Sequence, residues 1–130
     1  MSTVHIVLDT NILVSALLSR EGKPAKVYRM FLTRILLLIY SPQIFEEYQD
    51  VLYRPYLQIP HIDADIVLRA IRQNGKEVWV MPPSVGIMPD EDDRVFYDTA
   101  KSTGAFLITG NTKHYPSEPF IVTPAEFLEL

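Results

Sequence analysis

The sequence contains no cysteine among its 130 residues. This absence excludes disulfides and thiolate metal sites, so any bound metal ion would have to be held by carboxylate, amide or imidazole groups. It also agrees with a reducing compartment. Residues 1–8 lack the basic start and the long apolar stretch of a signal peptide. We therefore expect a cytoplasmic protein.

Long apolar runs are missing as well. The most apolar segment, residues 35–40, is far too short to cross a bilayer, which takes about 20 helical residues, and we expect no membrane partner. An excess of basic residues is also absent. The net charge of −4 argues against a protein that coats nucleic acid. An enzyme that gathers carboxylates around a metal ion is compatible with this charge, because the bound cation reverses it locally.

Several catalytic motifs are absent from the chain. There is no Gly-rich phosphate loop, no Gly-x-Ser-x-Gly turn and no His-Glu-x-x-His pair. The three histidines show no spacing typical of metal ligands, and we leave all of them, His114 included, out of the predicted catalytic set. Lys113 and His114 could touch a phosphate backbone, but a solvated loop over residues 110–116 is the simpler interpretation.

The length of the chain fits one domain, which we expect to span residues 1–130. Apolar residues make up 48% of it and charged residues 22%, which is enough apolar surface for a packed core without disulfides. We find no internal repeat, low-complexity tract or linker.

Strands and helices are predicted to alternate along the chain. Ser41 and Pro42 are typical of a helix N-cap and first helical position, and Asp63 is expected to cap the next helix. Strands are expected at residues 4–8, 35–40, 77–81, 105–109 and 120–122, and helices at 12–18, 25–33, 42–54, 63–75, 90–102 and from 124. This order predicts a three-layer α/β/α sandwich with a mainly parallel sheet of about five strands.

Four polar side chains follow the carboxyl ends of these strands. Asp9 ends the first strand, Glu47 and Asp93 lie near the starts of helices that follow the second and third, and Asn111 follows the fourth. Ligands of open α/β sheets bind beyond this edge of the sheet. We therefore expect the four side chains to lie close together and to form a candidate catalytic site.

Each acidic residue also has a simpler explanation. Asp9 could cap the helix that follows it. Glu47 borders the apolar stripe of its helix while Glu46 lies on the wet face, so Glu47 needs a partner such as a cation, unless its carboxylate merely reaches water.

The run from residue 90 to 93 has a similar ambiguity, since acidic residues are common at helix starts. Asp93 is singled out because Phe96 and Tyr97 follow on its side of the helix, with Asp92 as a competitor. Asp98, flanked by basic residues at helical spacing, is expected to form a surface ion pair.

Three segments resemble the PIN-domain family, specifically its small bacterial toxin-like members. They are residues 7–18, which contain Val-Leu-Asp-Thr-Asn, residues 41–55, which contain Phe-Glu-Glu-Tyr, and residues 90–111, which run from Asp-Glu-Asp-Asp to Ile-Thr-Gly-Asn. Together they cover nearly the whole chain in the family's order.

The resemblance implies a PIN-like fold in which Asp9, Glu47 and Asp93 are the acidic ligands of Mg²⁺ or Mn²⁺. Asn111 stands where many PIN domains have a fourth acid, which implies weaker metal binding. The implied activity is that of a metal-dependent endoribonuclease, the toxin of a toxin–antitoxin pair. The implied partners are an RNA substrate, a protein antitoxin and a second copy of the chain.

Two other functions stay open. Asn111 is compatible with a weak or inactive module that binds RNA without cleaving it. A metal-dependent phosphohydrolase is a possibility from another class, although dehalogenase-type phosphatases need an Asp two residues after the first, where this chain has Asn11.

Overall fold

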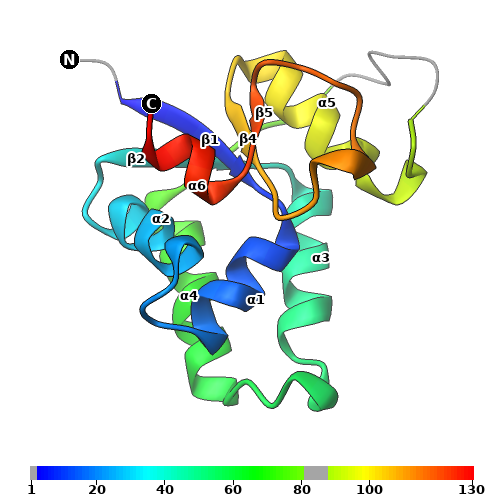
Figure 1. Cartoon of the computed structure of the whole chain (residues 1–130). Helices are drawn as coiled ribbons and strands as arrows, with labels where there is room; N and C mark the ends of the chain where they lie inside the picture. Colours follow the sequence, from blue (N-terminus) through cyan, green and yellow to red (C-terminus); the bar gives the residue numbers. More distant parts are fainter. Residues whose placement is uncertain (1–2, 81–87) are drawn as a thin grey trace.

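The computed structural model describes residues 3–80 and 88–130. Its centre is a sheet of five parallel strands in the order β3-β2-β1-β4-β5 (Figure 1). The strands are β1 Val4–Leu8, β2 Leu36–Tyr40, β3 Lys76–Glu77, β4 Phe106–Ile108 and β5 Ile121–Val122. The predicted fold class is confirmed, with β1 in the middle of the sheet.

Helices cover both faces of this sheet. One face is covered by α5, which packs against β1, β2 and β4, and the other by α2 and α6, which pack against β2 and β5 (Figure 1). The α-helices of the described residues are α1 Thr10–Leu18, α2 Lys23–Leu32, α3 Pro42–Leu52, α4 His61–Asn74, α5 Arg94–Thr103 and α6 Pro124–Leu128. Short 3-10 turns occur at η1 Pro55–Leu57, η2 Glu91–Asp93 and η3 Thr112–His114.

Most predicted boundaries fall within two residues of the observed ones. The Ser41 cap is confirmed, since its Oγ accepts a hydrogen bond from the Ile44 amide at 3.2 Å. The predicted cap at Asp63 is wrong: α4 begins at His61, and Asp63 lies in its first turn, where a carboxylate favours the helix dipole. The third strand is shorter than predicted; Met81 and the two prolines after it lie outside the described residues.

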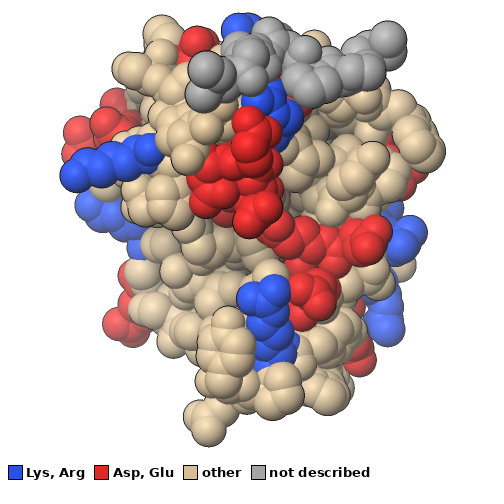
Figure 2. All heavy atoms as spheres, turned by 90° about the vertical axis from the view of Figure 1, so that its right-hand side faces the viewer, with Lys and Arg blue, Asp and Glu red and all other residues tan. Residues whose placement is uncertain are grey.

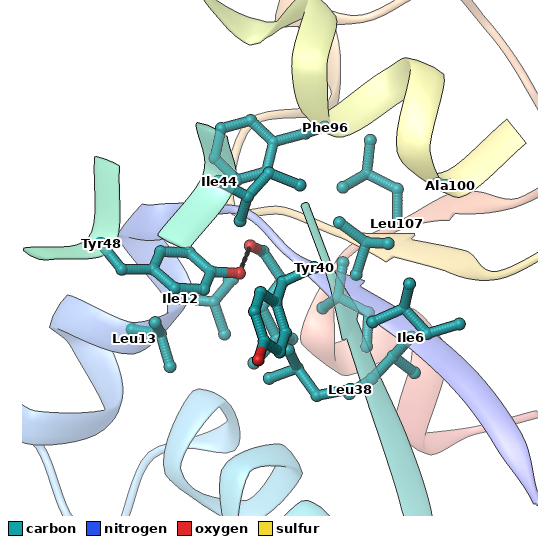
Figure 3. Packing of buried hydrophobic residues seen from close by; sticks show 14 of the residues in the cluster. Ile6, Ile12, Leu13, Leu38, Tyr40, Ile44, Tyr48, Phe96, Ala100 and Leu107 are labelled. Atoms are coloured by element: carbon teal, nitrogen blue, oxygen red, sulfur yellow. Dashed lines mark hydrogen bonds between the residues drawn. The ribbon is translucent and has the colours of Figure 1, made fainter. Parts of the chain in front are cut away.

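The core ties helix α3 to the end of the central strand. Ile6, Val7 and Leu8 of β1 are completely buried, as is Tyr48 of α3. The Tyr48 hydroxyl donates a hydrogen bond of 2.5 Å to the Leu8 carbonyl, which Figure 3 shows among the surrounding apolar side chains. This bond fixes α3 beside the last residue of β1. It thereby brings the residues next to Tyr48 and Leu8 to the same edge of the sheet.

Two glycines differ in the space around their Cα atoms, and substitutions at them therefore test how tightly the chain is packed near Gly75. A Cβ at Gly75 would lie 2.6 Å from the Ile71 carbonyl oxygen and 3.0 Å from that of Leu38, and neither backbone oxygen can move easily. Gly104 ends α5 with a φ of 71°, and a Cβ there would meet nothing within 4 Å.

We predict that Gly75→Ala lowers the free energy of unfolding by about 2–3 kcal/mol, because it forces an overlap with backbone atoms. Gly104→Ala, the matched control, should cost about 1 kcal/mol through its left-handed backbone alone. Urea denaturation of both variants measures the two costs. An equal or smaller loss for Gly75→Ala would contradict the close approach of Gly75 to the carbonyl oxygens of Ile71 and Leu38.

Candidate functional site

Asp9 lies at the carboxyl end of β1, in the middle of the sheet. Its side chain occupies the N-cap position of α1 but makes no capping hydrogen bond, so the simpler explanation of Asp9 as a helix cap is not what the structure shows. Instead, one carboxylate oxygen, Oδ2, accepts hydrogen bonds from the Thr109 hydroxyl at 2.8 Å and the Tyr115 hydroxyl at 2.9 Å. Only 7% of Asp9 is exposed. These two hydroxyls therefore hold a buried carboxylate in one orientation.

Glu47 reaches the same edge of the sheet from α3. It is half-buried, whereas Glu46 is exposed, as the helical spacing predicts. The Thr10 hydroxyl donates a hydrogen bond to Glu47 Oε2. Burial raises the pKa of Glu47 above its ordinary value. The hydrogen bond from Thr10 lowers the pKa, and the negative charge of Asp9 raises it.

Asp93, in the turn before α5, completes a group of three carboxylates. Its side chain is 16% exposed, while Asp92 is on the exposed side of the turn. Burial, the largest cause, and the charges of Asp9, Asp90 and Glu47 together raise the pKa of Asp93 to about 6, against the opposing effect of His114. The three predicted ligands therefore lie close enough together to repel one another.

One oxygen of Asp93 lacks a hydrogen-bond donor. Its Oδ2 is buried and has no hydrogen-bond partner in the part of the chain that the structure describes. The Nδ1 atom of His114 lies 3.2 Å away, but it is not aligned as a hydrogen bond. A buried carboxylate oxygen left in this state costs free energy unless a cation or a donor reaches it.

We left His114 out of the predicted catalytic set, yet ligand atoms of Asp90, Asp93 and His114 all lie within 4.8 Å of one another. Tyr115, buried and bonded to Asp9, was missed in the same way. Both residues belong to the loop after β4, which we expected to be solvated. The position of that loop at the ligand-binding edge of the sheet was the one feature of the sequence that could have indicated their place in the site.

Asn111 lies at this edge, and its side chain is engaged within its own turn. Its Oδ1 accepts a hydrogen bond from the backbone amide of Lys113 at 3.2 Å, and its Nδ2 lies 2.9 Å from His114 Nε2. The backbone amide of Asn111 donates to the Thr109 hydroxyl at 3.1 Å. Both atoms of the carboxamide therefore already have partners.

The surface position expected for Asp98 is wrong, because the residue is buried, with 6% of its surface exposed. It nevertheless lies close enough to Arg94, one turn before it, for the two charges to interact. The spacing to basic residues was misleading because the middle of α5 is buried on all sides, from Phe96 to Ala100. Asp98 faces the interior with its neighbours and takes no part in the group of three carboxylates.

The acidic residues at this edge have the donor chemistry that a hard divalent cation prefers. Among the described residues, the ligand atoms found within 4.8 Å of one another are those of Asp90, Asp93 and His114, so of the three predicted ligands Asp93 alone belongs to that compact group. Figure 2 views the molecule from the side of α3 and α5 and shows Asp and Glu side chains gathered into one continuous area. Mg²⁺ and Mn²⁺ prefer carboxylate oxygens. A cation bound among Asp9, Glu47 and Asp93 would offset their mutual repulsion and give the buried Oδ2 of Asp93 a partner.

The fold is an α/β fold of nuclease type, and a cluster of acidic side chains lies beyond the carboxyl ends of the central strands of its parallel sheet. Comparison with known proteins specifies the family. The family model described as PIN domain matches residues 5–113, which include all four predicted site residues. The chain belongs to the PIN-domain family, whose members are generally nucleases and typically bind divalent metals.

One known protein and one solved structure are similar to this chain. The uncharacterized protein MJ1680 of Methanocaldococcus jannaschii is 26% identical over 110 residues, which are 83% of this chain and 71% of that protein. The crystal structure of PAE2754 from Pyrobaculum aerophilum superimposes with a TM-score of 0.63 at 13% identity, covering 98% of this chain and 88% of that one. The second match shows the shared fold.

None of the helices in the segments that the structure describes combines the length and the apolar character that a bilayer crossing requires.

The raised pKa of Asp93 predicts how the stability of the metal-free protein depends on pH. A carboxyl whose pKa rises from 3.8 to about 6 on folding binds more protons in the folded state between these values. The free energy of unfolding should therefore fall as pH rises from about 4 to about 6, and Asp93→Asn should remove this part of the dependence. Thermal unfolding in EDTA between about pH 4 and about pH 6 measures this dependence. If the free energy of unfolding of Asp93→Asn changes with pH as steeply as that of the wild type, Asp93 is excluded as the source of the dependence.

Proposed function

We propose that this protein is an endoribonuclease that hydrolyses RNA phosphodiester bonds with Mg²⁺ or Mn²⁺ held by Asp9, Glu47 and Asp93. The observation that supports it most is the buried Oδ2 of Asp93, which lacks a hydrogen-bond donor beside two further carboxylates. Membership of a family that consists largely of nucleases agrees with this reading.

The residues of the chain prepare the site before any substrate arrives. Thr109 and Tyr115 hold the carboxylate of Asp9, and Thr10 holds that of Glu47, so little reorganisation is needed to bind a cation. A bound divalent ion supplies a water of lowered pKa and neutralises charge on the scissile phosphate. The carboxylates fix where that chemistry takes place, at the carboxyl end of β1.

A cavity whose lining includes Asn111 of the predicted site, but none of the three carboxylates, supports an anionic polymer as the substrate. Its volume is about 440 Å³, and it lies between the first turns of α1, α2 and α6. Asn11 and Asn111 line its wall toward the site, and Lys23 is the charged residue of its lining. The positively charged ammonium group of Lys23 would attract the sugar-phosphate backbone of RNA, which the acidic residues of the site repel.

The biological role follows from the resemblance to toxin-like PIN domains. We propose that the protein acts in the cytoplasm as the toxin of a toxin–antitoxin pair, is neutralised by a protein antitoxin and forms a homodimer. Growth arrest on expression, relieved by the product of a neighbouring small open reading frame, would support this role. A toxin role fails if expression of an RNA-cleaving protein leaves growth unchanged.

We predict that Asp9→Asn and Asp93→Asn each reduce Mg²⁺-dependent or Mn²⁺-dependent cleavage of structured RNA by about 100-fold or more, since even outer-shell changes at metal sites cost about 10–100-fold. Both substitutions keep the size of the side chain. Glu46→Gln and Asp92→Asn are matched controls, because they remove an exposed acid next to Glu47 and next to Asp93 respectively, and both should cleave nearly as fast as the wild type.

Three outcomes would change the assignment. Cleavage that survives Asp9→Asn in a clean preparation would contradict a role for the carboxylates. RNA binding without turnover at saturating Mg²⁺ or Mn²⁺ would favour the inactive RNA-binding module, as Asn111 suggests. Hydrolysis of small phosphomonoesters, with RNA left intact, would favour a phosphohydrolase.

We predict that Lys23→Gln raises the KM for RNA about fivefold, equivalent to about 1 kcal/mol, and leaves kcat nearly unchanged, because a backbone contact outside the reacting group affects binding. Lys26→Gln is the matched control, since Lys26 is exposed on the same helix and does not line the cavity. Steady-state kinetics at fixed salt measure both. Equal effects of the two substitutions would exclude the cavity as a contact for the RNA backbone.

A further inference from the structure

Asn111 connects two of the carboxylates through a continuous set of polar contacts. On one side its backbone amide donates to the Thr109 hydroxyl, which itself donates to Asp9 Oδ2. On the other side its carboxamide contacts His114 Nε2 at 2.9 Å, and His114 Nδ1 lies 3.2 Å from Asp93 Oδ2. We call this series of five residues the Asn111 bridge. It runs from the end of β1 to the turn before α5.

The orientation of the Asn111 amide follows from its other partner. The backbone amide of Lys113 can only donate a hydrogen bond, and it points at the Asn111 side chain from 3.2 Å. The atom that it meets must therefore be the carboxamide oxygen. This leaves the NH₂ group of Asn111 facing His114 Nε2, so that Nε2 must accept.

The acceptor role of Nε2 determines which imidazole nitrogen carries the proton. A neutral histidine has one donor and one acceptor nitrogen. With Nε2 accepting from Asn111, the proton is on Nδ1, the nitrogen that faces Asp93 Oδ2. The Nδ1–H group of His114 then lies 3.2 Å from the Asp93 oxygen that has no aligned donor among the described residues, and it can donate to that oxygen once the two side chains align.

We propose that Asn111 is a positioning residue that fixes the Nδ1–H tautomer of His114, and that His114 in turn orients the Asp93 carboxylate for a divalent cation. This inference rests on the proposed metal site and deepens it. Partners outside the ligands commonly orient metal-binding side chains in this way.

The bridge gives a physical reason for an amide at position 111. An aspartate there would accept from Nε2 instead of donating to it, which would move the proton of a neutral His114 away from Asp93. Asn111 therefore has a function that an acidic ligand at this position could not perform, because only the amide can donate to His114 Nε2. The family match ends at Lys113, one residue before His114.

The tautomer is tested by two-dimensional ¹H–¹⁵N correlation through the imidazole ring of ¹⁵N-labelled protein at mildly alkaline pH, without metal and with Mg²⁺. We expect His114 to carry its proton on Nδ1 in the wild type and to lose this preference in Asn111→Asp. A wild-type spectrum with the proton of His114 on Nε2 would overturn the inference. Asn111 is partly exposed and the His114 side chain about half exposed, so substitutions at either position should not affect folding.

The link to the cation is tested by two substitutions of similar size. In His114→Asn the amide nitrogen stands near the position of Nδ1 and can still donate to Asp93, whereas in His114→Gln the amide group stands near that of Nε2. We expect Mn²⁺ affinity, measured by electron paramagnetic resonance, to fall about 10-fold in His114→Gln and to be largely kept in His114→Asn. Equal affinities in the wild type and His114→Gln would overturn the role of His114.

Neither measurement depends on RNA cleavage. If the wild type shows the predicted tautomer and the two substitutions separate as expected, yet no RNA is cleaved, the ribonuclease proposal fails and the positioning role of Asn111 stands. If RNA is cleaved and both His114 variants bind Mn²⁺ like the wild type, the positioning role fails alone.

Discussion

Mutual repulsion among buried carboxylates is the constraint on which the other features of this site depend. Asp9, Glu47 and Asp93 come from three separate elements, and burial together with the neighbouring negative charges raises the pKa of both Glu47 and Asp93. The fold holds them together through contacts that do not involve the acids themselves. The most direct of these is the hydrogen bond from Tyr48 to the Leu8 carbonyl, which fixes α3 against the end of β1.

Neutral hydroxyl groups provide part of the compensation. Thr10, Thr109 and Tyr115 donate to Glu47 or Asp9. Thr10 and Thr109 lie just after the buried ends of β1 and β4, and Tyr115 is itself buried. Such donors stabilise a carboxylate without adding positive charge. In the proposed metal site, a cation would contribute most at Asp93 Oδ2, which has no hydrogen-bond partner among the described residues.

The sequence was sufficient to predict the parts of this arrangement that depend on periodicity. The apolar run of residues 35–40 and the alternation of strands with helices led to the correct sheet, and helical spacing separated half-buried Glu47 from exposed Glu46. These features repeat along the chain, and burial of one face is enough to determine them.

Features that depend on tertiary contacts were not predictable in this way. The loop of residues 110–116 looks polar and solvated, and nothing local shows that Tyr115 turns inward to Asp9 or that His114 approaches Asp93. Asp98 was misjudged because its basic neighbours in sequence indicate a surface, whereas that part of α5 is enclosed. Side-chain direction in a loop is set by the partners it meets, and these come from elements far away in the sequence.

The central claim is that one divalent cation is shared by carboxylates from β1, α3 and the turn before α5. Anomalous diffraction from a crystal containing Mn²⁺ tests it most directly. The account predicts a peak within coordinating distance of the carboxylates of Asp9 and Asp93, with Glu47 in the same coordination sphere or one water away. Full Mn²⁺ occupancy elsewhere, with no peak among these three side chains, would contradict it.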